Sequence, residues 1–198
     1  MTNTLRIPLH SFVDLITNSS SETFVSADRQ TVSTLEDIID VLLISVGSDQ
    51  KCHDLFRIGL DTEDGGYGHY KILYVEARNP KCRLAAKALD QLREAFVPVY
   101  QEDAGRHDDR YAIRATENAP RIIEDAINGV LGAAGSNKTS NDIVTISTKV
   151  AKPKTSEWED DELTLVVEPK ETGANHRQVA TAIQRIEKIF SAETVGND

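Results

Sequence analysis

The sequence predicts an α+β fold, a mainly antiparallel sheet built from three strand-strand-helix units with helices packed on it. Two observations support this expectation. Short segments with apolar residues at every second position occur in pairs, and each pair precedes a segment with apolar residues at helical spacing. Pairs of strands alternating with helices favour an antiparallel sheet, whereas single strands alternating with helices favour a parallel one.

The first unit lies near the N-terminus. Residues 11–17 suit a strand with apolar side chains on both faces, residues 18–21 suit a polar turn, and residues 23–26 suit a short second strand. Ser33 opens a capping-box pattern, which predicts the start of a helix, and Gly47 is expected to end it.

The second unit repeats this order. Alternating apolar residues predict strands at 55–60 and 69–76, separated by a wide turn. Asn79 and Pro80 are typical of a helix start, as cap and first-turn proline, and Pro98 is expected to stop that helix.

The third unit has strands expected at 143–150 and 163–168, and a last helix from about Asn175 that buries Phe190. An exposed polar connector, residues 100–115, and one extra helix from Asn118 come before it. The units show no residue-level similarity, so the predicted repeat is one of architecture.

Composition limits the classes of function. A chain of 198 residues, 39% hydrophobic, is expected to form a single α+β domain over residues 1–198, with two sub-sheets divided near residues 100–115 as the alternative. The net charge of −10 argues against a nucleic-acid partner. The apolar runs are too short for a signal peptide or a membrane span, so we expect a cytoplasmic protein without membrane contacts and with two reduced cysteines.

Three patterns suggest a bound nucleotide or metal but fail on spacing or context. Residues 132–139 approach a phosphate loop, yet they follow a helix and precede a strand. Residues 61–66 lack the ligand spacing of a calcium loop. A zinc site is the third pattern, and it would have to gather Cys52, His53, His69 and Cys82. We therefore expect no cofactor and no metal.

The serine-rich turn is the first candidate site. Its short polar side chains suit a rigid, hydrogen-bonded corner, and such a turn can also present hydroxyl and amide groups to an anion or to a partner's main chain. No sequence-local base or nucleophile elbow accompanies the serines, which argues against catalysis. The candidate residues are Asp14, Asn18, Ser19, Ser20, Ser21 and Glu22.

A long loop between the last two predicted strands is the second candidate site. A basic half is followed by an acidic half, and the only tryptophan of the chain lies where they join. The simpler interpretation is a solvated hairpin loop without a binding role. The functional interpretation is a protein contact anchored by the tryptophan, because aromatic side chains bury a large area at little entropic cost. The candidate residues are Lys152, Lys154 and Trp158.

The serine-rich turn also carries the only family resemblance. Residues Asp14-Leu15-Ile16-Thr17-Asn18-Ser19-Ser20-Ser21-Glu22 resemble a segment, D-x-I-T-N-S-S-S-E, near the N-terminus of uncharacterised proteins of large tailed bacteriophages. The resemblance covers about a dozen residues and implies a setting, a virus of bacteria, but no activity.

Three hypotheses follow. The first is a non-enzymatic bacteriophage protein that acts through protein contacts as a minor virion or assembly component, located in the host cytoplasm or in the virion, with a homo-oligomer as a further form. The second is a host-takeover enzyme or anion-binding module that uses the serine-rich turn. The third is an antagonist that mimics nucleic acid, which would require a contiguous acidic face.

Overall fold

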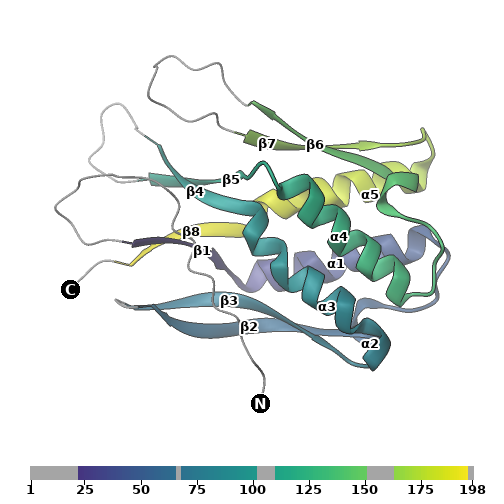
Figure 1. The fold of residues 1–198 in the computed structure, drawn as a ribbon, viewed down its shortest axis with the longest axis horizontal. Helices are drawn as coiled ribbons and strands as arrows, with labels where there is room; N and C mark the ends of the chain where they lie inside the picture. The colour runs from purple at the N-terminus through teal and green to yellow at the C-terminus, as the bar shows by residue number, and fades with distance from the viewer. Residues whose placement is uncertain (1–21, 66–67, 102–109, 151–162, 196–198) are drawn as a thin grey trace.

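A computed structural model describes residues 22–65, 68–101, 110–150 and 163–195, and over these ranges the α+β fold with antiparallel strand pairs is confirmed (Figure 1). The strands are β1 (Glu22–Ala27), β2 (Phe56–Gly65), β3 (Gly68–Ala77), β4 (Phe96–Gln101), β5 (Arg110–Ala115), β6 (Val144–Val150), β7 (Leu163–Pro169) and β8 (Phe190–Val195). The α-helices are α1 (Arg29–Ser45), α2 (Cys52–Leu55), α3 (Arg83–Asp90), α4 (Ala119–Ala133) and α5 (Ala174–Gln184). Short 3-10 helices are η1 (Pro80–Cys82), η2 (Gln91–Ala95), η3 (Ser140–Asp142) and η4 (Arg185–Lys188).

The described strands form two-stranded antiparallel ladders. Three ladders are hairpins of consecutive strands, β2 with β3, β4 with β5, and β6 with β7, and each hairpin leads into a helix. The fourth ladder joins β1 to β8, the first and last strands that the structure describes. The first and last described strands therefore lie side by side and close the described fold.

The elements fall into two units of the same order, unit 1 (residues 22–101) and unit 2 (residues 110–195). Each unit runs from a short strand through a long helix to a long hairpin, and returns through a shorter helix to a second short strand. The short strands pair between units rather than within them, since β1 pairs with β8 and β4 with β5. The predicted strand-strand-helix runs are thus parts of a larger, twofold repeat.

The repeat extends to single residues. Residues 22–61 align without a gap on residues 110–149, an offset of 88 positions. The identical pairs are Ala27 and Ala115, Glu36 and Glu124, Asp37 and Asp125, Ile39 and Ile127, Leu43 and Leu131, Gly47 and Gly135, Ser48 and Ser136, Asp54 and Asp142, and Ile58 and Ile146. The predicted lack of residue-level similarity concerned the three strand-strand-helix units, whereas this similarity relates the two halves of the chain.

The four ladders share one kind of cross-strand pair at the starts of β2, β4, β6 and β8, where each of these strands follows a helix. A buried phenylalanine or valine faces an alanine or proline of the partner strand. The pairs are Phe56 with Ala77, Phe96 with Ala115, Phe190 with Ala27, and Val144 with Pro169. A small residue leaves room for the large one, so this pairing fixes the register of each ladder.

A second repeated contact lies one residue further along. In three ladders the backbone amide after the alanine or proline donates to the carbonyl before the phenylalanine or valine. These bonds are Arg78 to Leu55 at 2.9 Å, Thr116 to Ala95 at 2.8 Å, and Lys170 to Ile143 at 2.9 Å. In the β1–β8 ladder the buried hydroxyl of Thr31 bridges instead, accepting from the amide of Asp28 at 3.0 Å and donating to the carbonyl of Ile189.

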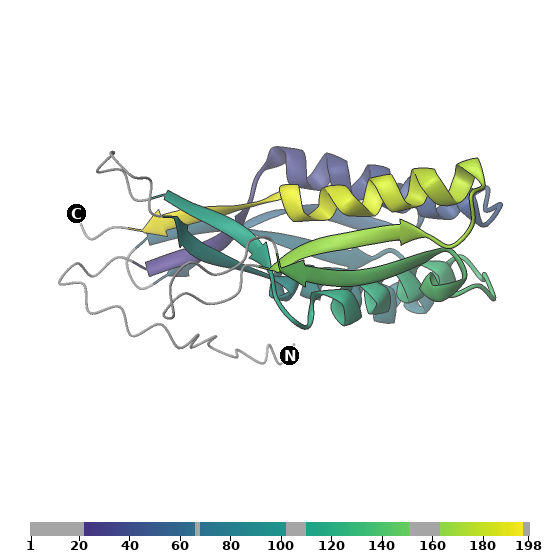
Figure 2. The ribbon, with the colours of Figure 1, turned by 90° about the horizontal axis from the view of Figure 1, so that it is seen from above.

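The core lies between the helices of both units. Contacts join α3 to α4, α5 to α1, and α1 to α4, so the helices pack mainly across the unit boundary. Figure 2 shows α1 and α5 side by side above the β6–β7 hairpin, with α4 below it. Helices α3 and α4 cross closely at Gly129, where an added Cβ would lie 2.9 Å from the Cα atom of Ala85.

Several element boundaries differ from the sequence-based expectation. Residues 100–115, expected as a connector, contain most of the β4–β5 hairpin. Pro98 is a strand residue there, which β4 tolerates because it pairs on one side only. Helix α1 is capped by Asp28, not Ser33, since the Asp28 carboxylate accepts from the amide of Thr31 at 2.9 Å. Phe190 begins β8 instead of continuing the last helix.

Candidate functional site

One end of the molecule, which we call the strand-tip end, gathers the turns of the chain. There β1 begins, β8 ends, and the β2–β3 and β4–β5 ladders have their tips, as Figures 1 and 2 show at their left-hand sides. The cross-strand pairs that mark this end are Glu22 with Val195, Gly65 with Gly68, and Gln101 with Arg110. The described part of the β6–β7 ladder points toward the same end and stops short of it, at the pair Val150 and Leu163.

Nearly all residues of the two predicted sites lie outside the described ranges. Of the serine-rich turn, Asp14 and Asn18 to Ser21 lie outside the described residues, and Glu22 is the first residue of β1. Lys152, Lys154 and Trp158 also lie outside them, between β6 and β7. The described residues that flank the two segments belong to separate ladders, β1–β8 and β6–β7, which point toward the same end of the molecule.

Val150 exposes an apolar side chain at the described tip of the β6–β7 ladder. It is the last residue of β6, it is 52% exposed, and it pairs with half-buried Leu163 across the ladder. The other large hydrophobic side chains exposed in the described ranges are Ile44 and Leu84, at the C-terminus of α1 and the N-terminus of α3. Those two positions lie toward the opposite end.

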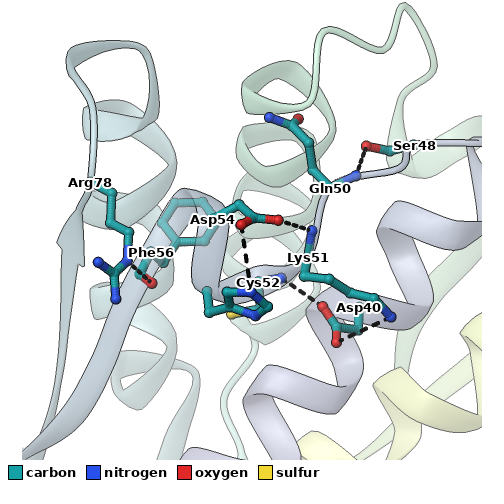
Figure 3. Close-up of polar contacts among 9 residues, drawn as sticks. Asp40, Ser48, Gln50, Lys51, Cys52, Asp54, Phe56 and Arg78 are labelled. Atoms are coloured by element: carbon teal, nitrogen blue, oxygen red, sulfur yellow. Dashed lines mark hydrogen bonds and ion pairs between the residues drawn. The ribbon is translucent and has the colours of Figure 1, made fainter.

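The opposite end contains two helix-to-strand corners, where α1 leads to β2 and α4 leads to β6. In the first corner the Asp40 carboxylate accepts from the amide of Cys52 at 2.6 Å, and the Asp54 carboxylate accepts from the amide of Lys51 at 2.8 Å (Figure 3). The Lys51 ammonium lies 4.0 Å from Asp40 with both side chains partly exposed, so this ion pair adds little.

The second corner repeats the first at the same offset. The Asn128 amide oxygen accepts from the amide of Ser140 at 2.7 Å, and the Asp142 carboxylate accepts from the amide of Thr139 at 2.7 Å. Gly47 and Gly135, with φ of 73° and 76°, end the preceding helices. The oxygen acceptors are thus committed to backbone groups, and the corners are structural.

The cysteines do not supply a nucleophile. Burial, with the carboxylates of Glu36 and Asp40 nearby, raises the pKa of the Cys52 thiol to about 12, so the thiol stays protonated at neutral pH. Cys82 is fully buried. Among the residues that the structure describes, no three His, Cys, Asp or Glu side chains lie where they could hold a metal ion together.

The segments that approach a phosphate loop and a calcium loop have structural roles in their described parts. Residues 132–139 form the end of α4 and the second corner, with the amide of Ser136 donating to the carbonyl of Leu131 at 2.9 Å. Asp61 and Thr62 belong to β2 and pair with Ile72 and Lys71. Both segments therefore follow the backbone geometry of helix ends and hairpins.

Two hollows of the described residues differ greatly in size. An apolar cavity of about 10 Å³ lies between the helices, too small and too apolar to hold even a water molecule securely. An open groove of about 810 Å³ lies between the two units, from Asn79–Lys81 to Gly132–Gly135. Neither hollow gathers the convergent polar groups that a small-molecule site needs.

Comparisons with known proteins add no relative: no protein-family model, no curated protein and no solved structure matches the chain. In the described ranges, no helix combines the length and the hydropathy needed to cross a membrane.

Sequence reasoning missed the acceptors at the corners and the bridging hydroxyl of Thr31. Their signal was present in the chain, as the spacing Gly-Ser followed six residues later by Asp, which occurs at Gly47 and again at Gly135. An alignment of the chain against itself at an offset of 88 positions would have found it.

Proposed function

We propose that the chain is a non-enzymatic bacteriophage protein that works through protein contacts at its strand-tip end, as a minor virion or assembly component. The observation that carries the proposal is the position of the two candidate segments. The described strands next to them run toward the same end of the molecule: Glu22 begins β1 there, and Val150 and Leu163 form the described tip of the β6–β7 ladder, which points to that end.

Three further observations support the same proposal. Val150 exposes an apolar side chain beside the segment that contains Trp158. The polar groups of the corners are committed to the backbone, and Cys52 is protonated. The phage setting comes from the resemblance of residues 14–22, so the partners would be other phage or assembly proteins. The site of action would be the cytoplasm of the host bacterium, or the virion.

Binding to dissociated virion proteins tests the proposal. Purified virions of a large tailed phage that carries this protein are dissociated. Their proteins are then passed over the immobilised full chain. We expect one defined virion protein to bind, and Trp158→Ala to weaken that binding at least tenfold. Leu84→Ala removes a side chain that is 82% exposed toward the other end, so it serves as the matched control and should bind as the wild type does. An equal loss in both variants, or no bound protein, contradicts the proposal.

A further inference from the structure

The two units meet through an extensive surface formed by described helices and strands of both. Unit 1 contributes β1, α1, α3 and β4 to this surface, and unit 2 contributes β8, α5, α4 and β5. Residues 102–109 connect the units along the chain and lie outside the described residues. We call this surface the unit interface.

The unit interface is self-complementary. The contact of α3 with α4 corresponds to that of α5 with α1, and the β4–β5 ladder corresponds to the β8–β1 ladder. Phe96 and Phe190 begin the equivalent strands β4 and β8, and their ring centroids are 5.3 Å apart. Equivalent residues touch one another only close to a twofold axis, so these rings mark that axis.

The interface is also well specified. Each of its ladders pairs a buried phenylalanine with an alanine, Phe96 with Ala115 and Phe190 with Ala27. Two hydrogen bonds also cross it, from the amide of Thr116 to the carbonyl of Ala95 at 2.8 Å and from the hydroxyl of Thr31 to the carbonyl of Ile189. A surface with fixed register, an apolar centre and hydrogen bonds across it has the properties of a protein-protein interface.

We propose that the unit interface is a docking surface whose partner can be the matching unit of a second copy of this chain. The fold is then a fused dimer, and two chains can exchange units, unit 1 of each pairing with unit 2 of the other. Each exchanged pair regains the same ladders and helix contacts. This inference concerns a different surface from the strand-tip end and does not depend on the function proposed above.

The connector decides between the closed and the exchanged form. In a closed chain the two units are held at an effective concentration near the millimolar range, which favours pairing within one molecule. Gln101 and Arg110 are cross-strand partners, about 5 Å apart, so the connector must reverse direction completely. A connector that cannot reverse removes the closed form and leaves the interface free for a second chain.

Replacing the connector tests the proposal with the full chain. Eight prolines in place of residues 102–109 form a stiff spacer of roughly 25 Å, and eight Gly and Ser residues form a flexible control of equal length. We expect light scattering to give the control the mass of the wild-type chain and the proline variant twice that mass, with equal far-ultraviolet circular dichroism. A proline variant with native dichroism and the wild-type mass overturns the proposal.

If the eight prolines prevent folding, cleavage of the connector provides a second test of the proposal. A protease site is inserted within residues 102–109, and the folded full chain is cleaved there. The two pieces should elute together at the mass of the uncut chain, and should re-form a one-to-one complex after dilution from urea. Pieces that separate after cleavage, or that do not reassemble, overturn the proposal.

Discussion

Thr31 allows the sharpest test of how β1 is joined to β8. Its fully buried hydroxyl bridges the amide of Asp28 and the carbonyl of Ile189. The equivalent position in unit 2 is Ala119, which needs no hydroxyl because Thr116 bonds directly to the other strand. Thr31 therefore replaces a backbone hydrogen bond that the other ladders possess.

Thr31→Val keeps the size of the side chain and removes the hydroxyl. The buried carbonyl of Ile189 then lacks a donor, and an unsatisfied buried group costs about 1–3 kcal/mol. A loss of about 2 kcal/mol lowers the melting temperature of a chain of this length by roughly 4–8 °C. Thr31→Ser is the control, since it keeps the hydroxyl and loses one methyl group, worth about 1 kcal/mol. Urea unfolding followed by circular dichroism compares them, and a valine variant as stable as the serine variant refutes the bridging role.

Three further variants test the repeat and the core by urea unfolding. Asp40→Ala should destabilise the protein by about 1–2 kcal/mol and Asn128→Ala by a similar amount, because each removes the acceptor for the backbone amide that begins the next element. Asp40→Asn keeps an acceptor oxygen and should retain most of the stability. An equal loss in both Asp40 variants would contradict the capping role. Gly129→Ala should destabilise by roughly 1–3 kcal/mol through contact with Ala85, and Gly132→Ala, whose Cβ meets open space, should be neutral or slightly stabilising; the reverse order would place the close helix crossing elsewhere. Above pH 9 the Cys52 thiol ionises in the unfolded chain, whereas the folded chain keeps it protonated up to about pH 12. The free energy of unfolding should therefore fall as the pH rises, by at most about 1.4 kcal/mol per pH unit from this group. Cys52→Ala should remove this part of the pH dependence, and an unchanged slope would show that the thiol is not buried as described.

The class of fold was predictable because periodicity reports which face of an element is buried. The apolar residues of α4, among them Ile123 and Val130, recur at helical spacing, and the helix lies where expected. The β2–β3 and β6–β7 hairpins were predictable for the same reason, through alternation along each strand.

The closure of the chain was not predictable from local patterns. The pairing of β1 with β8 joins residues at opposite ends of the sequence, and no turn signal links them. The segment from Phe96 to Gln101 carries a proline and follows a helix directly, so its strand character was obscured. The candidate residues of the serine-rich turn and the Trp158 loop, apart from Glu22, lie outside the described residues, and their contact role stays a prediction.

A cross-strand disulfide tests the central claim, that the two units are joined by the pairing of β1 with β8. Thr23 and Thr194 are cross-strand partners in the β1–β8 ladder, at a separation that a disulfide spans. Thr23→Cys with Thr194→Cys should oxidise readily and stabilise the protein by up to roughly 5 kcal/mol, because the bond closes a very long loop. Thr23→Cys with Glu193→Cys is shifted by one residue to the other face and should not form the bond. Equal oxidation of the two pairs, or oxidation of neither, would contradict the paired ends and the twofold architecture built on them.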